Sequence, residues 1–365
     1  MPERVFQVIM AGGSGTRFWP ASRAGRPKQF LALVSDRPLI RQAFDRAAAF
    51  SDAADVWVAA GLSHRSKVLE ALPDLDPARY IAEPFGRNTA PCIGLAALML
   101  SRIDPRGVMI VSPADHVTTD PAELYRALGL AVESARSQDA LVTLGIKPTR
   151  PETGYGYIEA GGDADSAVRR AARFVEKPDA ATAERYVRSG RYLWNSGVFV
   201  WRTDVILRAI RRHVPDLWSG LEAIDEALGR PDEAAVIRRV FESLPAESID
   251  YAVLEKESEV LVVPTDPGWS DVGSWDAVAE LRSADPAGTV IAEAPGYRGD
   301  VVAIDSEGCF VVPSAESGRA IALIGVKDLV IVDTGDALLV CRKGASQSVR
   351  QVVKTLEGRG RNDLL

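Results

Sequence analysis

Short apolar runs rich in β-branched residues alternate with longer amphipathic stretches through the first two-thirds of the chain. The longer stretches, at residues 39–50, 90–103 and 122–137, carry apolar side chains at helical spacing and are long enough to cross a sheet. Alternation of this kind is typical of parallel strands joined by crossover helices, so the sequence predicts an α/β sheet. The runs that we expect to form its strands are Val5–Met10, Asp55–Ala60, Val108–Ser112 and Ala140–Gly145.

The middle of the chain continues this alternation with less regular spacing. Strand-like runs occur at Phe174–Val175, Gly197–Trp201 and Glu259–Val263, and helical stretches at Thr203–His213 and Asp232–Glu242. We therefore assign residues 1–285 to one α/β domain in which helices flank the sheet.

The pattern changes after about Gly288, where short strand-like runs follow one another with Gly or Asp turns and no helix between them. A helical stretch at Ser346–Glu357 ends the chain, and Asp285-Pro286 marks a plausible boundary. We therefore expect residues 286–365 to form a small β domain with a terminal helix, and we find no convincing long repeat in the sequence. Its expected strands are Val301–Ile304, Cys309–Val312, Ala320–Ile324, Leu329–Val332 and Leu338–Cys341.

Composition and charge limit the partners of this chain. Its 365 residues, 47% hydrophobic and 25% charged, are ordinary for a globular protein of two domains. A net charge of −7 argues against a general nucleic-acid binder and against binding to an acidic membrane surface, because both polyanions would be repelled. Any anionic ligand must therefore be met by a local group of cations, backbone N–H groups or a metal ion.

The three cysteines, Cys92, Cys309 and Cys341, are unevenly spaced, and no CxxC motif occurs. Neither a disulfide framework nor a zinc cluster is indicated, which fits a reducing cytoplasm. The sequence has no charged leader with a long apolar segment and no run of 18 apolar residues, so we expect a soluble cytoplasmic protein.

A glycine-rich loop follows the first expected strand. Glycines let the backbone approach a phosphate chain and turn its N–H groups toward the oxygens, while Arg17 and Lys28 supply positive charge, so a polyphosphate site is implied. The alternative is an ordinary tight turn between a strand and a helix. The loop matches neither the P-loop motif nor the GxGxxG dinucleotide fingerprint. Its residues are Ala11, Gly12, Gly13, Ser14, Gly15, Thr16 and Arg17.

This loop, extended to Phe30 as GGSGTRFWPASRAGRPKQF, resembles the signature of the sugar-1-phosphate nucleotidyltransferases, and most closely their mannose-1-phosphate guanylyltransferase branch. The resemblance covers nearly the whole chain. It implies a Rossmann-like, GT-A-like mixed sheet and a small C-terminal β domain with a β-helix-like form. Further matching motifs, in the family's order, are EPFGRNTAP at 83–91, PADH at 113–116, TGYGY at 153–157, FVEKP at 174–178, NSG at 195–197 and WSDVGSW at 269–275.

Two acids follow strand-like runs, Asp115 after the run at 108–112 and Asp271 in a Gly/Trp-rich loop. Strand ends of an open α/β sheet converge on a crevice, where two carboxylates can share one hard cation such as Mg²⁺. For either residue alone, a turn or a helix N-cap is the alternative. The resemblance implies that both hold the Mg²⁺ that bridges the two substrates' phosphates. The role of the neighbouring His116 stays open.

The resemblance also assigns the acceptor side. Glu176 and Asn195 would bind mannose hydroxyls, Gly156 would bring the backbone close to the sugar beside Tyr155, and Lys177 would contact the sugar phosphate. A surface Glu-Lys pair without function is the alternative for Glu176 and Lys177. The aromatic residues Tyr155, Tyr157, Trp194, Phe199 and Trp201 are interpreted as core and pocket wall.

The nucleotide side rests on the same likeness. Asn88 and Thr89 are the candidates for reading the purine, and capping of the helix that follows is an alternative that can hold at the same time. Arg17, Lys28 and Lys177 are expected to act as catalytic charges, because the transfer needs positioning and charge neutralisation rather than an enzyme nucleophile. The remaining nucleotide-binding candidates are residues 11–16, Glu83, Pro113 and Ala114.

The expected reaction joins GTP and mannose 1-phosphate into GDP-mannose and pyrophosphate. Two alternatives remain at this point: a nucleotidyltransferase for another sugar or base, and a non-catalytic sensor of sugar nucleotides. The sensor would be expected to lose charged catalytic positions, and here they are present. Some relatives carry a fused phosphomannose isomerase, whose activity is not expected from the 75 or so residues after Gly288. The C-terminal domain is often part of a dimer contact, so a homodimer is an open option.

Overall fold

The computed structural model describes residues 3–13, 15–294 and 296–365. Its internal contacts divide these residues into two compact units, which we describe separately. The first unit holds residues 3–12, Ala43–Ala114 and Thr118–Trp269, and the second holds Gly13–Gln42, Asp115–Val117 and Ser270–Leu365. No helix among the described residues combines the length and apolarity needed to cross a bilayer.

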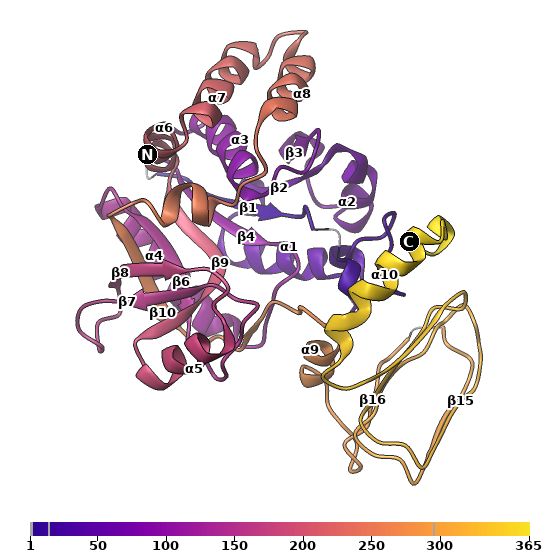
Figure 1. Cartoon of the computed structure of the whole chain (residues 1–365). Coiled ribbons are helices and arrows are strands. Elements are labelled where there is room, and N and C mark those ends of the chain that lie inside the picture. The colour runs from indigo at the N-terminus through magenta and orange to yellow at the C-terminus, as the bar shows by residue number, and fades with distance from the viewer. Residues whose placement is uncertain (1–2, 14, 295) are drawn as a thin grey trace. The chain divides into compact units, whose positions relative to one another are not determined.

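A nine-stranded mixed sheet forms the centre of the first unit (Figure 1). Strand β1 pairs in parallel with β2 and β4, whereas β9 runs antiparallel to both β4 and β6. The order across the sheet is β3-β2-β1-β4-β9-β6-β10-β8-β7. The bounds are β1 Val5–Met10, β2 Val56–Gly61, β3 Tyr80–Glu83, β4 Val108–Pro113, β6 Leu141–Ile146, β7 Tyr157–Ala160, β8 Arg169–Val175, β9 Tyr192–Arg202 and β10 Val260–Thr265.

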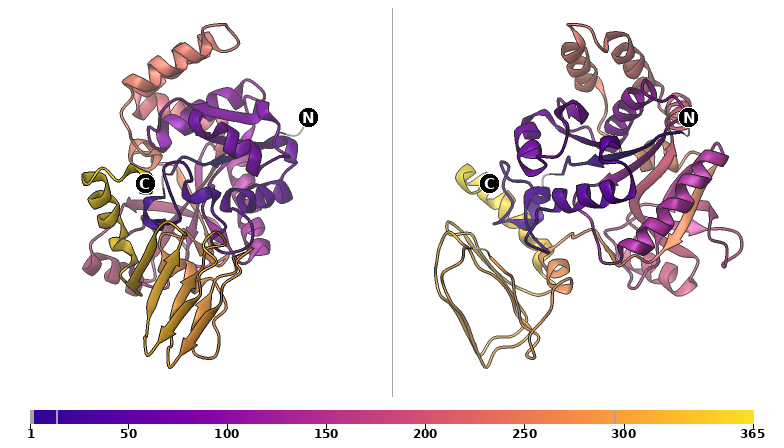
Figure 2. Two further views of the ribbon diagram at one scale, coloured as in Figure 1. Left: turned by 90° about the vertical axis from the view of Figure 1, so that its right-hand side faces the viewer. Right: turned by 180° about the vertical axis from the view of Figure 1, so that it is seen from behind.

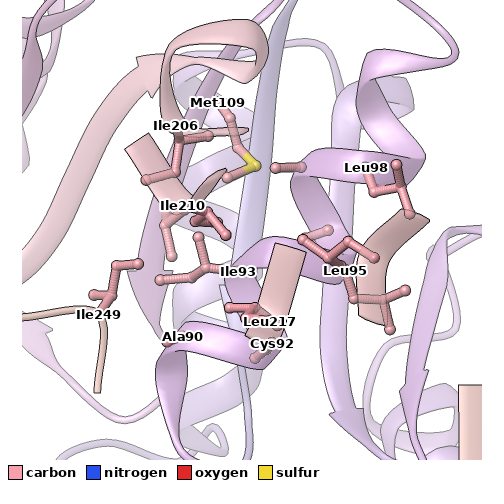
Figure 3. Packing of buried hydrophobic residues seen from close by; sticks show 14 of the residues in the cluster. Ala90, Cys92, Ile93, Leu95, Leu98, Met109, Ile206, Ile210, Leu217 and Ile249 are labelled. Carbon is pink, nitrogen blue, oxygen red and sulfur yellow. The ribbon is translucent and has the colours of Figure 1, made fainter. Parts of the chain in front are cut away.

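Both faces of this sheet are buried at its centre, as the alternation along β4 demonstrates. Val108 and Ile110 pack with the apolar side of α4, while Met109 and Val111 pack with α3 and α6 on the opposite face (Figure 3). Strands covered on both faces read as continuous apolar runs, which explains why these strands were predictable. The helices are α1 Leu39–Phe50, α2 Arg65–Ala71, α3 Thr89–Ser101, α4 Pro121–Ser137, α5 Ala180–Ser189, α6 Thr203–His213, α7 Pro215–Ala227 and α8 Glu233–Ser243.

For most predicted helices and strands of this part, the two ends lie within two residues of those in the structure. Helices α1 and α6 have the predicted first and last residues. The predictions around 174 and 197 were too short, because β8 and β9 begin several residues earlier. Helices α2, α5 and α7 and strands β3 and β7 were not predicted. The short strands β5 Val117–Thr118 and β11 Trp269–Ser270 lie where the chain passes between the units.

The second unit contains a coil of parallel strands (Figure 2). Register pairs Val290 with Phe310, Phe310 with Val330 and Val301 with Ile321, so each turn of the coil advances 20 residues. This is the β-helix-like form that the resemblance implied. No convincing long repeat is visible in the sequence, yet the structure of this segment repeats every 20 residues. The parallel strands are β12 Val290–Ile291, β13 Val301–Ile304, β14 Phe310–Val312, β15 Ile321–Ile324 and β16 Leu329–Asp333, and β17 Leu338–Arg342 pairs antiparallel with β16.

Corner residues with positive φ explain how a 20-residue period arises without a visible sequence repeat. Gly288, Gly308 and Asp328 have φ of 74°, 66° and 51°, and they occupy the same place in successive turns. Asp305 and Gly325 form a second such pair at 45° and 63°. Glycine and Asp can both adopt the left-handed backbone conformation although their side chains differ. The repeat is therefore one of backbone conformation and is not visible as a repeat of residue types.

A separate apolar core holds the second unit together. The aromatic side chains of Phe18, Trp275 and Phe310 are buried in it, with Phe18 edge-on to Trp275 at a centroid separation of 5.1 Å. Helix α9 (Trp275–Glu280) and the terminal helix α10 (Val349–Gly358) contribute to the same core. The residues that follow the glycine-rich loop therefore share one core with the C-terminal segment.

Candidate functional site

A polar cavity of about 250 Å³ lies within the second unit. Three cationic side chains and two carboxylates face it, although they come from segments spread over more than 300 positions of the sequence. We call it the Arg17 pocket. Its lining residues are Gly15, Thr16, Arg17, Phe18, Lys28, Asp115, His116, Asp271, Gly273 and Arg350.

The glycine-rich loop forms one wall of this pocket. Gly15 has φ of 63°, and a Cβ there would lie 2.4 Å from the Cβ of Lys28, so only glycine permits this close approach. A short 3₁₀ turn at Thr16–Phe18 follows, and Phe18 is buried in the core. The turn thereby directs Thr16 and Arg17 to the pocket, where Arg17 Nη1 lies 3.5 Å from the carbonyl oxygen of Gly273.

Lys28 joins the two predicted metal-binding acids. Its buried ammonium lies 3.1 Å from Oδ2 of Asp115 and donates to the backbone carbonyl of Asp271 at 2.6 Å. Burial alone would raise the pKa of Asp115, but the charges of Lys28 and His116 outweigh it and hold that pKa below its usual value. Asp115 is therefore ionised at neutral pH and available to a cation.

The pocket suits a hard divalent ion of the Mg²⁺ type. Such an ion is commonly held by one or two carboxylates and completes its shell with water and substrate phosphates. Asp115 and Asp271 line the same cavity. Among the described residues no group of three or more His, Cys, Asp or Glu residues stands ready to hold a metal. An ion bound here would therefore take its remaining ligands from solvent or substrate.

The predicted sugar-binding residues gather separately, within the first unit. Asn195 donates its backbone N–H to the carbonyl of Gly156 at 2.8 Å. A Cβ on Gly156 would lie 2.5 Å from Oε2 of Glu176 and 3.3 Å from the Cβ of Asn195. The ammonium of Lys177 pairs with the carboxylate of Glu176. The four residues therefore form one cluster, which we call the Glu176 cluster.

Sequence reasoning missed a further member of this cluster. Asp250 opens the π-helical turn η6 (Asp250–Leu254), and its Oδ1 accepts a hydrogen bond from Nδ2 of Asn195 at 2.7 Å. Burial, reinforced by the nearby Glu176 carboxylate, raises the pKa of Asp250 to about 6. Asn195 Oδ1 also accepts from the N–H of Gly197 at 3.1 Å, so the amide is held at both ends. π-Helical turns occur frequently at functional sites, but no sequence pattern predicted this one.

The predicted purine-reading residues have structural roles that the structure makes plain. Asn88 Oδ1 accepts from the N–H of Thr89 at the start of α3, and Thr89 Oγ1 accepts from the N–H of Ile249 at 2.8 Å. The capping alternative is therefore confirmed. Asn88 also has φ of 65°, an unusual value for a residue other than glycine, and such conformations cluster at functional sites.

The other nucleotide-binding candidates in the first unit lie at strand ends. Glu83, the last residue of β3, is buried. Burial raises its pKa to about 7, although a hydrogen bond with Cys92 acts in the opposite direction. Ala11 follows β1 and donates to the carbonyl of Ala59, and Ala114 follows β4 and donates to that of Met10. Pro113 ends β4 itself, and Gly12 follows Ala11.

The structure thus brings together two groups of the predicted residues. Gly15, Thr16, Arg17, Lys28, Asp115 and Asp271 share the Arg17 pocket, and Gly156, Glu176, Lys177 and Asn195 share the Glu176 cluster. Neither group includes Ala11, Gly12, Glu83, Asn88, Thr89, Pro113 or Ala114. Ser14 lies outside the described residues, and Gly13 belongs to the second unit.

The interpretation of these aromatic residues as core is confirmed for four of them, and a role as pocket wall stays a prediction. Tyr157, Trp194, Phe199 and Trp201 are buried, and the half-buried Tyr155 lies edge-on to Trp194 at a centroid separation of 5.2 Å.

Comparison with known proteins points in one direction. A family model described as nucleotidyl transferase matches residues 6–287, and one described as MannoseP isomerase/GMP-like beta-helix domain matches residues 299–356. The xanthan biosynthesis protein XanB of Xanthomonas campestris pv. campestris is 40% identical over 363 residues, which cover 98% of this chain and 74% of that protein.

Two further similarities span the chain. The mannose-1-phosphate guanylyltransferase of Escherichia coli (strain K12) is 40% identical over 372 residues, covering 99% of this chain and 75% of that protein. A crystal structure described as mannose-1-phosphate geranyltransferase from Thermus thermophilus has a TM-score of 0.86 at 36% identity, covering 97% of this chain and 99% of that one.

Proposed function

The chain belongs to the nucleotidyl transferase family, and from this premise we propose that it transfers GMP from GTP to mannose 1-phosphate, giving GDP-mannose and pyrophosphate. Its nucleotidyltransferase fold carries a β-helix-like domain at the C-terminal side. The observation that carries the proposal is the Arg17 pocket, in which Arg17, Lys28, Asp115 and Asp271 meet. The choice of mannose and guanine rests on the names of the similar proteins.

In the proposed reaction a phosphate oxygen of mannose 1-phosphate attacks the α-phosphorus of GTP in line. The new oxygen–phosphorus bond forms as the bond to the β-phosphate oxygen breaks, and pyrophosphate carries away the electron pair. Two like unit charges 4 Å apart cost about 4 kcal/mol at an effective dielectric of 20, so neutralisation is the main task of the protein. Arg17 and Lys28 are assigned to the triphosphate and Lys177 to the sugar phosphate.

The Glu176 cluster would hold the sugar. The Glu176 carboxylate can accept hydrogen bonds from two hydroxyls. The missing side chain of Gly156 lets this carboxylate and Asn195 lie close to its backbone, because a Cβ there would lie 2.5 Å from Oε2 of Glu176. Asp250 would act as a positioning residue, because its hydrogen bond fixes which way the Asn195 amide points.

Enzymes of this family generally use a divalent metal ion. We assign Mg²⁺ to Asp115 and Asp271, which fit it as described above. Bound there, the ion would neutralise phosphate charge near the reacting phosphorus. The contribution of the chain is to keep Asp115 ionised through Lys28 and to tie the Asp271 loop to the same ammonium.

For the nucleotide we assign the backbone of residues 11–16 to the phosphates, and Glu83, Asn88, Thr89, Pro113 and Ala114 to the nucleoside. The positive φ of Asn88 and the burial of Glu83 support this assignment. We also assign the protein to the cytoplasm, in keeping with three free cysteines, and propose a homodimer.

A substrate panel tests the function. GTP, ATP, UTP and dTTP are each combined with mannose 1-phosphate or glucose 1-phosphate, with and without Mg²⁺, and pyrophosphate release is measured. The proposal predicts the highest kcat/KM for GTP with mannose 1-phosphate and none without a divalent ion. Equal or better use of another pair would refute the substrate assignment.

A further inference from the structure

Arg350 is a cationic residue of the Arg17 pocket that neither motif nor resemblance indicated. It is the second residue of α10, more than 300 positions from the glycine-rich loop, yet it lines the same cavity as Arg17 and Lys28. Its side chain is solvent-exposed. The terminal helix therefore forms part of the wall of this pocket.

The position of α10 is fixed by packing inside the second unit. Val349 and Val353 are buried in the core that contains Phe18 and Trp19, the residues that follow the glycine-rich loop. These flanking apolar contacts leave little freedom for the helix to turn away from the pocket.

Hydrogen bonds at both ends of α10 reinforce this placement. Before the helix, Asp276 of α9 accepts from the N–H of Gly344 at 2.8 Å and from the hydroxyl of Ser346. After the helix, Trp19 Nε1 donates to the carbonyl of Leu364 at 2.9 Å. The presence of Arg350 at the pocket is thus a consequence of several independent contacts.

The charge of Arg350 is also not compensated locally. Lys28 is matched by Asp115 at 3.1 Å, whereas within residues 3–13, 15–294 and 296–365 the guanidinium of Arg350 makes no ion pair or side-chain hydrogen bond. A guanidinium is a bidentate donor that suits phosphate oxygens. An exposed cation at the edge of a cationic pocket is therefore available to an anionic ligand.

We propose that Arg350 binds the β- and γ-phosphates of the nucleoside triphosphate, which leave as pyrophosphate, so that the terminal helix of the β-helix-like domain completes the substrate site. This inference rests on the proposed function. It assigns Arg350 to the triphosphate because Arg17 and Lys28 share its pocket, while Lys177, assigned to the sugar phosphate, belongs to the other unit. The two terminal phosphates carry most of the triphosphate charge and most need a further cation.

The test compares Arg350→Ala and Arg350→Lys with Lys354→Ala in the full-length protein with Mg²⁺. Lys354 is an exposed cation one turn further along α10 that does not line the pocket, so it controls for loss of charge on the helix. Loss of a charge-assisted phosphate contact is expected to weaken binding about 10-fold or more. We expect Arg350→Ala to raise the KM for GTP by that factor, with Arg350→Lys intermediate and Lys354→Ala unchanged.

The substrate dependence separates a contact from a folding defect. The KM for mannose 1-phosphate should stay within about two-fold, and in the reverse reaction the KM for pyrophosphate should rise while that for GDP-mannose changes less. A kcat/KM for GTP within two-fold of wild type in Arg350→Ala, or equal losses for both substrates, would overturn the inference.

A binding measurement keeps this test separate from the proposed function. Calorimetric titration of inorganic pyrophosphate with Mg²⁺ into the wild type and Arg350→Ala needs no turnover. A wild type that binds pyrophosphate but makes no GDP-mannose would refute the function and leave Arg350 supported by weaker binding in the variant. Equal affinity of the two proteins would refute the role of Arg350.

Discussion

A single cation in the Arg17 pocket gives the sharpest residue-scale prediction. Arg17→Ala should lower kcat about 10²–10³-fold, the usual cost of losing one electrostatic stabiliser of a transition state. Arg26→Ala is the matched control, since Arg26 is an exposed arginine of the same segment that does not line the pocket. Steady-state kinetics of both variants decide the matter, and a near-normal rate for Arg17→Ala would remove Arg17 from the chemistry.

The metal assignment is tested at Asp271. Asp271→Asn keeps the shape of the side chain but halves the number of carboxylates facing the pocket. We expect the Mg²⁺ concentration for half-maximal activity to rise about 10-fold or more, in line with losing one charged ligand. A titration with Mg²⁺ that coincides with that of the wild type would exclude Asp271 as a ligand.

Asp250 makes the stability of the protein depend on pH. Its pKa of about 6 in the folded chain exceeds the ordinary value of 3.8, so between these pH values the folded chain keeps a proton that the unfolded chain has lost. The stabilisation is therefore complete below about pH 4 and is lost as the pH rises through 6. At pH 8 the wild type must keep this carboxylate ionised in a poorly solvated place.

Replacement of that carboxyl by an amide removes this cost. Asp250→Asn should be more stable than the wild type by about 1–3 kcal/mol at pH 8 and should lose the advantage at pH 4. Denaturant unfolding at both pH values measures it, with Asp216→Asn, an exposed position on α7, as the control. An advantage that is the same at both pH values would contradict the role of the shifted pKa.

The residues that the sequence revealed and those that it hid differ in kind. Arg17, Lys28 and Asp115 belong to short contiguous motifs. Phosphate-binding and metal-binding loops of this kind can be recognised from the sequence alone. Asp250 and Arg350 come from an irregular turn and from an ordinary amphipathic helix, and only packing brings them to their sites. The local sequence around these two residues does not predict such tertiary contacts.

At the scale of single elements, two glycines of the first unit should respond to alanine with opposite signs. Gly129 is exposed within α4, and a Cβ there would meet nothing within 4 Å, so Gly129→Ala should stabilise by about 0.5–1 kcal/mol. Gly145 is buried in β6, where a Cβ would lie 2.6 Å from Leu193 and 2.7 Å from Val262.

The crowding at Gly145 predicts a cost. Gly145→Ala should destabilise by about 1–3 kcal/mol, the usual penalty for overpacking a core. Thermal and denaturant unfolding of the two variants measure the pair. Equal effects of the same sign would show that the packing around β6 differs from that described here.

Elements with one dominant signal were the ones that the sequence predicted well. Strands β1 and β4 are buried on both faces and α6 has a clear apolar stripe, so period and length sufficed. Strand β8 alternates exposed and half-buried residues and is rich in arginine, which concealed most of its length. The coil of the second unit was predicted as strands, but its parallel stacking depends on corner conformations at 288, 308 and 328.

At the scale of the whole molecule, each compact unit is built from segments that are not contiguous in the sequence. The predicted division at residue 285 follows the change of sequence pattern, and it stays a proposal. The contacts instead group residues 13–42, which include most of the glycine-rich loop, and residues 115–117 with the segment from 270 onward. The sequence pattern reports local structure. It could therefore not show that residues 13–42 pack with the segment from 270 onward. The place of Arg350 at the pocket follows from that grouping, because α10 shares one apolar core with Phe18 and Trp19, which follow the loop.

The fate of the α-phosphate tests the central claim most directly. With GTP labelled at the α-phosphorus, unlabelled mannose 1-phosphate and Mg²⁺, the account predicts that label enters GDP-mannose in equal amount to the pyrophosphate released. No labelled protein should form, because the sugar phosphate attacks directly. Pyrophosphate release that does not need mannose 1-phosphate, or label retained covalently on the enzyme, would contradict the account.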